Sequence, residues 1–362
     1  MADPSAPMQR AIAAAHNVRG HTSPNPWVGA VVVRDGSLVS VGATSAYGGA
    51  HAEAAALANI DAAGTTLFTT LEPCMPFEGK RTPPCVEAIV ASRVSRVVVG
   101  IEDPHAPVRG AGVSYLRAHG IEVEVGDGAE AITSLMRPYL KFRSTGTPYC
   151  IAKFAVSLDG KVGAPAQGIR WLTSALALNR AHQDRAWVDA IMVGSGTVIA
   201  DDPALTARPD GVETGHQPLR VVLDGRGRID PGAKVFGRGA LLCTTSSPIA
   251  WRNSVTATGA AVLELESDDS GVNLDQLFRV LGQRSVMSLL VEGGPSLLAS
   301  LFEAELADEV HAYVAPRILG PDGIPLLPDS PRFDAEPLRE VELEVLHPDV
   351  LIRGYTGNWS PA

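Results

Sequence analysis

Residues 51–90 read HAEAAALANIDAAGTTLFTTLEPCMPFEGKRTPPCVEAIV, and this stretch decides the fold of the first part of the chain. Its Ala-rich start predicts a helix over 51–59, the apolar run over 66–71 predicts a strand, and residues 85–92 again favour a helix. Helix, strand and helix in so short a span are typical of an α/β sandwich built on a single sheet.

The same stretch carries a histidine and two cysteines in an order that suits a metal ion. Zinc takes imidazole nitrogen and thiolate sulfur in a tetrahedron, and a catalytic zinc leaves one corner for water. We therefore predict that His51, Cys74 and Cys85 are zinc ligands. Glu53 lies close enough to exchange protons with the water without being a ligand. Together these residues follow the signature of zinc-dependent deaminases, which act on nitrogen heterocycles.

Each part of this pattern is weak alone, because a single His-x-Glu or Pro-Cys is more often an ordinary solvated or core pair. Their combination, in this order, favours the metal site. The compact form of the signature spaces its cysteines as C-x-x-C, whereas here ten residues separate Cys74 from Cys85. We expect this longer loop to reach the substrate. Cys150 and Cys243 lie in apolar runs and are predicted to be small buried core residues.

Outward from this stretch, the flanking sequence continues the α/β pattern. Asp35-Gly36 between two apolar runs predicts a β-hairpin. The turn-forming stretch Ser144-Thr-Gly-Thr-Pro148 is the candidate boundary between two domains, residues 1–145 and 149–362. The expected elements of the first domain are a helix over 8–18 and strands over 28–33, 38–42, 94–101 and 121–125.

The second domain also alternates strands and helices, but it lacks a GxGxxG fingerprint, so a standard Rossmann domain is not expected. Glu292-Gly-Gly-Pro295 instead stands between an apolar strand and a helix whose first N–H groups can hold a phosphate of a dinucleotide. A Gly-Gly-Pro turn is also common as a simple helix entry. The expected elements are helices over 173–187 and 295–304, and strands over 149–156, 190–194, 219–224, 240–244, 286–291, 309–315 and 341–355.

Composition limits the classes of partner. The chain has 362 residues, 45% of them hydrophobic and 19% charged, with a formal net charge of -10. An acidic protein repels nucleic acid and anionic lipid, so a phosphate-bearing substrate must be held by local basic groups. The first residues do not resemble a secretory signal, no apolar run is long enough for a membrane span, and four cysteines are too few for a disulfide scaffold. These features predict a cytoplasmic enzyme without nucleic-acid or membrane partners, and they leave open whether it forms a homo-oligomer.

The loop sequence TLEPCMPFEGKRTPPCVEAI over 70–89 resembles the bifunctional deaminase/reductase family of riboflavin biosynthesis. Similar motifs follow in the family's order, and they are SPNPWVGAVVV (23–33), HAEAAAL (51–57), KFAVSLDGK (153–161), RWLTS (170–174), VGSGTVIADDPALTAR (193–208) and VEGGPSLL (291–298). The resemblance implies an α/β fold with a cytidine-deaminase-like α/β/α sandwich followed by a dihydrofolate-reductase-like α/β domain.

The resemblance also implies two reactions on a phosphoribosylated pyrimidine. Zinc-dependent hydrolysis would replace an amino group of a diaminopyrimidinone by a carbonyl, and NADPH would then reduce the ribosyl chain to a ribityl chain. Carried over by position, the implied cofactor contacts are Ala155, Trp171, Thr197, Asp201, Gly225, Gly294, Pro295, Ser296, Leu297, Leu298, Ala299 and Ser300. The implied substrate contacts are Asn25, Lys80, Lys153, Arg185, Leu205, Arg208 and Glu292, with the two arginines as clamps for the substrate phosphate.

Three positions depart from the family pattern. Thr44 stands where many members have a substrate-contacting histidine, the Cys74–Cys85 loop is two residues longer and lacks a histidine, and Ile169 replaces a serine. These departures keep two alternatives open, namely a related phosphoribosyl-pyrimidine as substrate, or activity in only one domain. A nucleic-acid-editing deaminase is a third reading, but it would need a basic stripe with exposed aromatic residues, and aromatics are 5% of this chain.

Overall fold

The computed structural model describes residues 3–76, 82–105, 108–165, 168–169, 171–268, 271–327 and 337–361. The chain divides into two compact units, one ending at Gly146 and the other running from Thr147 to Ser360. Among the described residues, no helix has the length and hydropathy that crossing a membrane requires.

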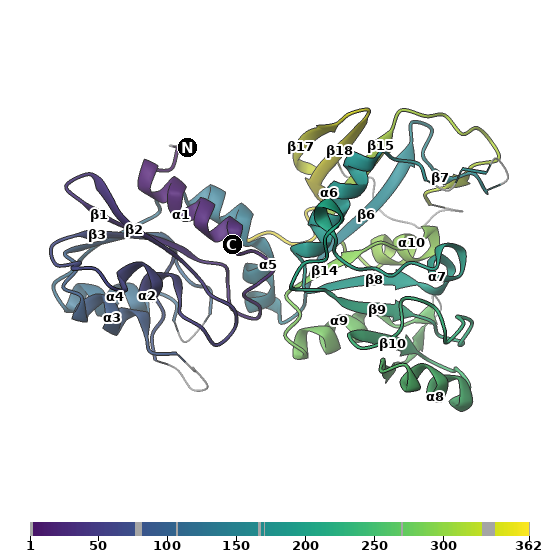
Figure 1. Ribbon diagram of the computed structural model, residues 1–362, viewed down its shortest axis with the longest axis horizontal. Helices are drawn as coiled ribbons and strands as arrows, with labels where there is room; N and C mark the ends of the chain where they lie inside the picture. Colours follow the sequence, from purple (N-terminus) through teal and green to yellow (C-terminus); the bar gives the residue numbers. More distant parts are fainter. Residues whose placement is uncertain are drawn as a thin grey trace. The chain divides into compact units, whose positions relative to one another are not determined.

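The first unit is a sheet of five described strands with helices on both faces (Figure 1). The strand order is β2-β1-β3-β4-β5; β1 is antiparallel to both of its neighbours, and β3, β4 and β5 are parallel. Helices α1 and α5 cover one face, and α2, α3 and α4 cover the other. The bounds are α1 (Ala6–Asn17), β1 (Gly29–Arg34), β2 (Ser37–Ala43), α2 (Ala52–Leu57), β3 (Thr66–Leu71), α3 (Cys85–Ala91), β4 (Arg96–Ile101), α4 (Ala111–Ala118), β5 (Glu122–Val125) and α5 (Ala129–Thr145).

Two glycines of the β1–β2 hairpin are required by its geometry, one in the turn and one under a helix. The turn between β1 and β2 has positive φ at both Asp35 and Gly36, as the predicted two-residue hairpin requires. On β2, a Cβ atom at Gly42 would overlap the backbone of Ala52 and Ala56, so only glycine lets α2 lie directly on the strand. Since α2 begins beside His51, this contact sets the distance of the predicted metal site from the sheet.

The second unit contains a sheet with the strand order β11-β10-β9-β8-β14-β6-β15-β18-β17. From β11 to β15 all neighbours are parallel, and β18 and β17 close that end with antiparallel pairs. The strands are β6 (Tyr149–Ser157), β8 (Ala190–Gly194), β9 (Leu219–Leu223), β10 (Ala240–Thr244), β11 (Ala261–Glu264), β14 (Ser288–Val291), β15 (Glu309–Ala315), β17 (Arg339–Leu346) and β18 (Asp349–Tyr355). The other elements are α6 (Ala175–Ala186), α7 (Ser195–Asp201), α8 (Ile249–Ala257), α9 (Leu274–Gln283), α10 (Pro295–Glu303), a 3-10 turn over Pro209–Gly211, and the short pairs β7 (Lys161–Gly163) with β16 (Ile324–Pro325) and β12 (Ser267–Asp268) with β13 (Gly271–Val272).

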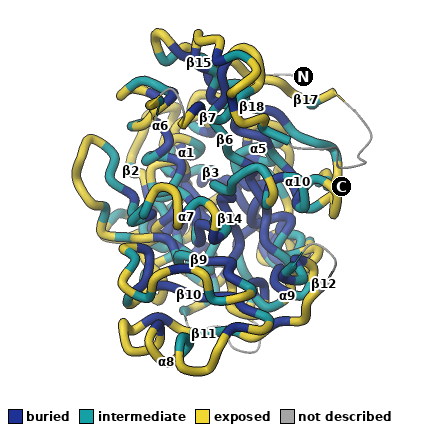
Figure 2. Tube along the Cα trace, turned by 90° about the vertical axis from the view of Figure 1, so that its right-hand side faces the viewer, coloured by how far each residue is buried: buried dark blue, intermediate teal, exposed yellow. Residues whose placement is uncertain are grey.

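Side chains of the larger sheet alternate between two hydrophobic cores. On β6, Cys150 and Ala152 face the core that α9 and α10 cover, whereas Tyr149 and Ile151 face the opposite core. Cys150 and Cys243 are fully buried, as the sequence predicts. Figure 2 shows the central strands β9, β10 and β14 mostly buried, while α8 at the margin of the sheet exposes most of its residues.

Two expectations about the elements are wrong. The single strand predicted over 341–355 is a hairpin, β17 and β18, because His347 and Pro348 interrupt the apolar pattern with a turn. The prediction also omitted helices α4, α5, α7, α8 and α9. Helix α5 contains Pro138, which removes a backbone hydrogen bond and usually argues against a helix. Its buried face (Ile132, Met136 and Tyr139 among others) stabilises it in spite of that loss.

Candidate metal centre and cofactor pocket

The metal centre brings together three side chains from separate segments. His51 immediately precedes α2, Cys74 follows β3, and Cys85 begins α3. Their ligand atoms all lie within 4.8 Å of one another. The carboxyl end of β3 and the first turns of two neighbouring helices therefore meet at this point. The three residues predicted as zinc ligands form one cluster.

The spacing within this cluster fits a tetrahedral zinc ion. The Nδ1 atom of His51 lies 3.5 Å from the Cys74 Sγ atom and 3.4 Å from the Cys85 Sγ atom. Zinc–ligand bonds of ordinary length at a tetrahedral angle separate a sulfur from a nitrogen by about 3.6 Å. Nδ1 is thus the nitrogen positioned for zinc. The Nε2 atom lies 3.0 Å from Thr82 Oγ1, which can accept its proton and hold the ring in this orientation.

Glu53 lies beside the cluster in the first turn of α2 and is 3% exposed. Burial, together with the charge of Cys74, raises the pKa of its carboxyl group to about 7. A hydrogen bond from Cys85 holds the pKa of the Cys74 thiol at about 3, so Cys74 is a thiolate at neutral pH. A carboxyl group that titrates near neutrality can both accept and return a proton, as acid–base catalysis requires.

Glu72 holds the Cys74 segment in place, a role that sequence reasoning missed. Its carboxylate is 2% exposed and accepts the backbone N–H groups of Asp103, Gly110 and Val113 at 2.9–3.2 Å. These donors belong to the loop before α4 and to its first turn. The carboxylate satisfies groups that a helix start leaves unpaired, and it ties that loop to the metal-binding segment. An acidic residue two positions before a ligand cysteine is the only signal in the sequence.

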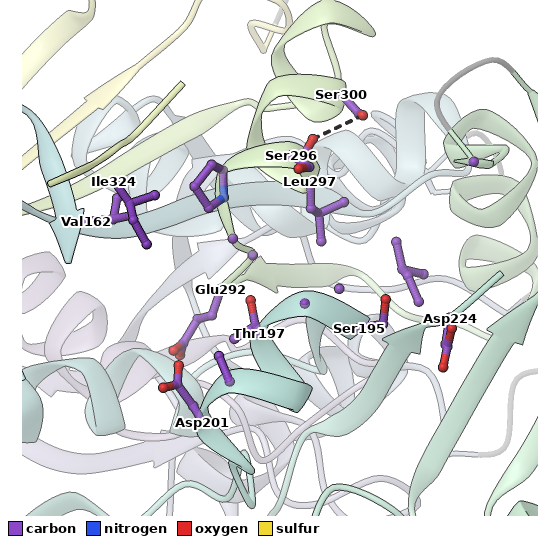
Figure 3. Close-up of a pocket in the computed structure, with 18 of the residues that line it drawn as sticks. Val162, Ser195, Thr197, Asp201, Asp224, Glu292, Ser296, Leu297, Ser300 and Ile324 are labelled. Atoms are coloured by element: carbon purple, nitrogen blue, oxygen red, sulfur yellow. Dashed lines mark hydrogen bonds between the residues drawn. The ribbon is translucent and has the colours of Figure 1, made fainter. Parts of the chain in front are cut away.

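The second unit contains a cavity of about 1360 Å³ along the carboxyl ends of its parallel strands. Such strand ends are where open α/β sheets bind ligands. Figure 3 shows Glu292 and Asp201 toward one side, Asp224 toward the other, and Ser195 and Thr197 between them. Ser296 and Leu297 enter from α10, whose first residues follow β14 directly.

A buried ion-pair cluster stands at the Glu292 side of this cavity. The Arg185 guanidinium contacts both oxygens of Glu292, at 2.6 and 2.8 Å, and Lys153 Nζ lies 3.5 Å from the same carboxylate. Burial alone would raise the pKa of Glu292, but Arg185 and Lys153 lower it to about 2. Glu292 is therefore a permanent anion at neutral pH. Because Arg185 grips Glu292, its guanidinium is engaged by protein and is not an open phosphate clamp.

A second charged cluster lies between α6 and β15, and sequence reasoning missed it as well. The two ring nitrogens of His311 lie 3.1 Å from Asp184 and 2.8 Å from Glu309. Tyr313 donates to Asp184 at 2.6 Å, and Arg180 pairs with the same carboxylate. Burial opposes the charge on His311, yet the two carboxylates raise its pKa to about 9. The imidazolium joins β15 to the helix that carries Arg185.

Comparison with known proteins decides the family. The model of the cytidine and deoxycytidylate deaminase zinc-binding region matches residues 1–101, and the RibD C-terminal domain matches residues 148–352. The riboflavin biosynthesis protein RibD of Bacillus amyloliquefaciens is 38% identical over 354 residues, 95% of this chain and 94% of the relative. That of Escherichia coli is 35% identical and covers 93% of this chain and 96% of its own length.

The chain belongs to the RibD family. Solved RibD structures agree along nearly the whole chain. That of Acinetobacter baumannii superposes with a TM-score of 0.86 at 34% identity, covering 96% of this chain and 97% of that one. A deaminase/reductase from Thermotoga maritima gives 0.83 at 32% identity, with the same coverage. The expected fold class is confirmed: a cytidine-deaminase-like domain precedes a dihydrofolate-reductase-like domain. Zinc and NADPH are the cofactors of these two RibD domains.

The RibD resemblance also implied substrate contacts in the deaminase domain. The residues at these positions differ in their surroundings, and one of them is not described by the structure. Asn25 is half-buried, with its backbone carbonyl accepting from Thr22. Lys80 lies outside the described residues. Thr44, in the position of the usual RibD histidine, is 4% exposed and bonds to the backbone of Val28 across the hairpin. Its hydroxyl group is therefore turned into the sheet and is not exposed at a pocket rim.

Most of the implied reductase contacts line the cavity. The predicted residues on its wall are Lys153, Ala155, Trp171, Thr197, Asp201, Gly225, Glu292, Gly294, Pro295, Ser296, Leu297 and Ser300, and Ile169, which departs from the family pattern, lies there too. Arg185 lies behind Glu292, and Arg208 bonds to Thr206. Leu205 and Leu298 are packed in the cores, so any contact they make with a ligand must come from the backbone. Ala299 lies on α10 and is not among the residues that line the cavity.

Proposed function

We propose that residues 1–145 hydrolyse diaminohydroxyphosphoribosylaminopyrimidine to release ammonia, and that residues 149–362 reduce the resulting 5-amino-6-(5-phosphoribosylamino)uracil with NADPH. The structural neighbour from Thermotoga maritima is named for both of these activities. The observation that carries the proposal for this chain is the convergence of His51, Cys74 and Cys85 beside a buried, proton-binding Glu53. A structural zinc site has no need of that carboxyl group.

In the deaminase step we assign the ligands and the proton carrier separately. His51, Cys74 and Cys85 would hold zinc, which when bound lowers the pKa of a water molecule to about 7 and so supplies the nucleophile. Glu53 accepts the proton that this water loses as its oxygen bonds to the ring carbon. It then returns the proton to the amino nitrogen, whose bond to carbon breaks as ammonia leaves. Thr82 keeps the His51 ring in the tautomer that leaves Nδ1 free for the metal.

In the reductase step, NADPH when bound would supply a hydride to the first carbon of the ribose chain. The bond from that carbon to the ring oxygen breaks, and a proton from solvent on that oxygen completes the gain of two hydrogens. We assign Lys153 and Glu292 to the ribose oxygens, since both line the cavity and already hold each other. Arg185 orients Glu292 by its two-point contact. Arg208 remains the candidate for the substrate phosphate. The wall contributed by Ile169 is apolar, so a substrate group that meets a serine hydroxyl in other members would here lose a hydrogen bond worth about 1 kcal/mol.

The test is to incubate zinc-loaded protein with the diaminopyrimidinone phosphate, with and without NADPH, and to follow products by mass spectrometry. We expect the deaminated compound alone without NADPH, and the same compound gaining two hydrogens when NADPH is present. Ammonia release without any NADPH-dependent gain would mean that only the first domain is active. If the protein does not react with this substrate, the result would support a related phosphoribosyl-pyrimidine as the substrate. Thr44 and Ile169, which depart from the family pattern, are the basis of that alternative.

We also propose that the enzyme works in the cytoplasm. None of the four cysteines forms a disulfide in the structure, and the two at the metal centre must stay reduced to bind zinc. A reducing compartment maintains that state. The net charge of -10 supports a small-molecule substrate over a nucleic acid.

A further inference from the structure

The cavity of the second unit ends on a basic loop to which the resemblance assigned only Gly225. Along the sheet, its wall passes from Lys153 on β6 and Glu292 after β14 to Arg226 and Arg228 after β9, and to Ser246 after β10. Neighbouring parallel strands lie about 4.8 Å apart, so three strand spacings separate β14 from β10. The two ends of the cavity therefore differ in position and in chemistry.

The orientation of a bound dinucleotide follows from this arrangement. The reacting end must reach the ribose chain of the substrate, which we place at Lys153 and Glu292. Helix α10 begins between the two ends, at Gly294 and Pro295, where free N–H groups suit the pyrophosphate. The adenosine half then extends over the ends of β9 and β10. This step rests on the proposed reductase function.

The loop after β9 is rigid. Asp224 is 1% exposed and accepts the backbone N–H groups of Gly227, Arg228 and Ile229 at 2.7–3.1 Å. The Gly225 carbonyl accepts the N–H groups of Thr245 and Ser246, which joins this loop to the end of β10. The Asp224 charge is directed into the loop and is satisfied there. The loop consequently presents its arginine side chains from a fixed backbone.

The positively charged residues on the cavity wall differ in whether another protein group already binds them. Among the described lining residues, Lys153, Arg226 and Arg228 carry positive charge. Lys153 is paired with Glu292, and Arg228 donates to Ser195. Arg226 is exposed, and it forms no ion pair with any acid in the described part of the chain. An unpaired guanidinium on a fixed loop, with serine and threonine hydroxyls nearby, suits a phosphate dianion.

We propose that Arg226, supported by Arg228 and the Ser246 hydroxyl, binds the 2′-phosphate of NADPH and determines the preference for NADPH over NADH. That phosphate is the one chemical difference between the two cofactors. It lies on the adenosine ribose, the part that extends toward β9 and β10. Arg226 contributes to binding only and takes no part in hydride transfer.

The kinetic test compares the two cofactors in the full-length chain with the deaminated intermediate as substrate. We expect Arg226→Gln to reduce kcat/KM for NADPH by roughly 10- to 100-fold, the loss typical of a charge-assisted bond. For NADH the value should change much less. Arg226→Lys keeps the charge but loses the two-point grip, so its loss should be intermediate. Arg238→Gln, an exposed arginine outside the cavity, is the matched control and should match the parent for both cofactors.

A binding test separates this inference from the proposed activity. Calorimetry with adenosine 2′,5′-bisphosphate and with 5′-AMP measures the contribution of the 2′-phosphate without turnover. The parent should bind the bisphosphate more tightly, and Arg226→Gln should remove most of that advantage. An unchanged preference in Arg226→Gln, in binding and in kinetics, would show the proposal to be wrong even with an active parent. A parent that discriminates between the two nucleotides but shows no NADPH oxidation would contradict the reductase assignment alone.

Discussion

Glu53 and Glu292 are two nearly buried carboxyl groups that the fold treats in opposite ways. Glu53 is 3% exposed and the Glu292 side chain 10%, so burial disfavours the charge on both. At Glu53 burial is the largest influence and the charge of Cys74 acts in the same direction, so its pKa is raised to about 7. At Glu292, Arg185 and Lys153 reverse the effect of burial, and the pKa falls to about 2. The charged groups beside each carboxyl group, and not its degree of burial, decide whether it is ionised at neutral pH.

The contrast matches the two chemistries that we assign. A hydrolytic deamination must move a proton from water to a leaving nitrogen, which needs a carboxyl group able to exist in both forms at neutral pH. A reductase that receives its hydride from a cofactor needs fixed groups to hold the sugar. A permanently charged Glu292, gripped by an arginine, serves that purpose.

Glu53→Gln should give the largest effect. The amide keeps the shape of the carboxyl group but cannot carry a proton, so we expect ammonia release to slow by about 100- to 10,000-fold. NADPH-dependent reduction of the deaminated intermediate should stay at the parent rate, and zinc content by elemental analysis should be unchanged. Equal deamination rates in mutant and parent would refute the role of Glu53.

Glu292→Gln should affect stability more than any substitution at Glu53. Removing one partner of a buried ion pair leaves Arg185 uncompensated, and such losses typically reach about 3 kcal/mol. The depressed pKa gives the pH dependence: this stabilisation is present above about pH 4.5 and is lost as the pH falls through about 2.

The measurement is calorimetric unfolding of the full chain, in which the reductase transition is identified by its shift with NADPH. That transition should move to lower temperature in Glu292→Gln, while Glu53→Gln should leave it unmoved. Similar shifts from both substitutions would remove the distinction drawn between the two carboxyl groups.

His311 extends the same comparison to a buried cation. Its pKa is raised from 6.5 to about 9 by Asp184 and Glu309. A raised pKa stabilises the fold fully below about pH 6.5, and this contribution is lost as the pH rises through about 9. We expect the free energy of unfolding of the reductase domain to fall by on the order of 2 kcal/mol across that window. For His311→Gln, denaturant titrations repeated at several pH values should show a much smaller change in the free energy of unfolding between pH 6.5 and 9. A parent whose stability is level from pH 6.5 to 9 would contradict the charged state of His311.

Thr82→Val should give the smallest effect of these substitutions. It tests whether the Thr82 hydroxyl group orients His51 in the deaminase domain. The substitution removes the acceptor for His51 Nε2 without changing the metal ligands, and loss of such a partner commonly weakens metal binding about tenfold or more. Competition with a chelator measures the zinc affinity directly. Thr82→Ser retains the hydroxyl group and should bind zinc as the parent does. If valine and serine behave alike, the hydroxyl does not orient the histidine.

The metal centre was predictable because its residues lie in one short stretch and zinc accepts few ligand types. His51, Cys74 and Cys85 need only their order and spacing to be recognised. Thr82 and Glu72 were not, because a threonine or glutamate carries no signal until the fold shows which backbone or ring nitrogen it faces. The hairpin at Asp35-Gly36 was predictable for the same local reason, since both residues tolerate positive φ.

The reductase pocket was less accessible to sequence reasoning because it is assembled from strand ends far apart in the chain. Arg185 was expected to clamp a phosphate, yet it grips Glu292, which is 107 residues away. His311 gave no signal, because Asp184 reaches it only through the packing of α6 on β15. Helix α5 was hidden by Pro138, whose unfavourable effect on a helix is outweighed by burial of the surrounding face.

Gly42 shows that catalytic competence can be lost without touching a reactive atom. Any larger residue there would force α2 outward, and with it the imidazole and the proton-carrying carboxyl group that the helix delivers. A saturation library screened for ammonia release should therefore return inactive clones at this chemically inert position. Sorting such clones as merely misfolded would overlook that the strand serves as a template for the spacing of the reacting groups.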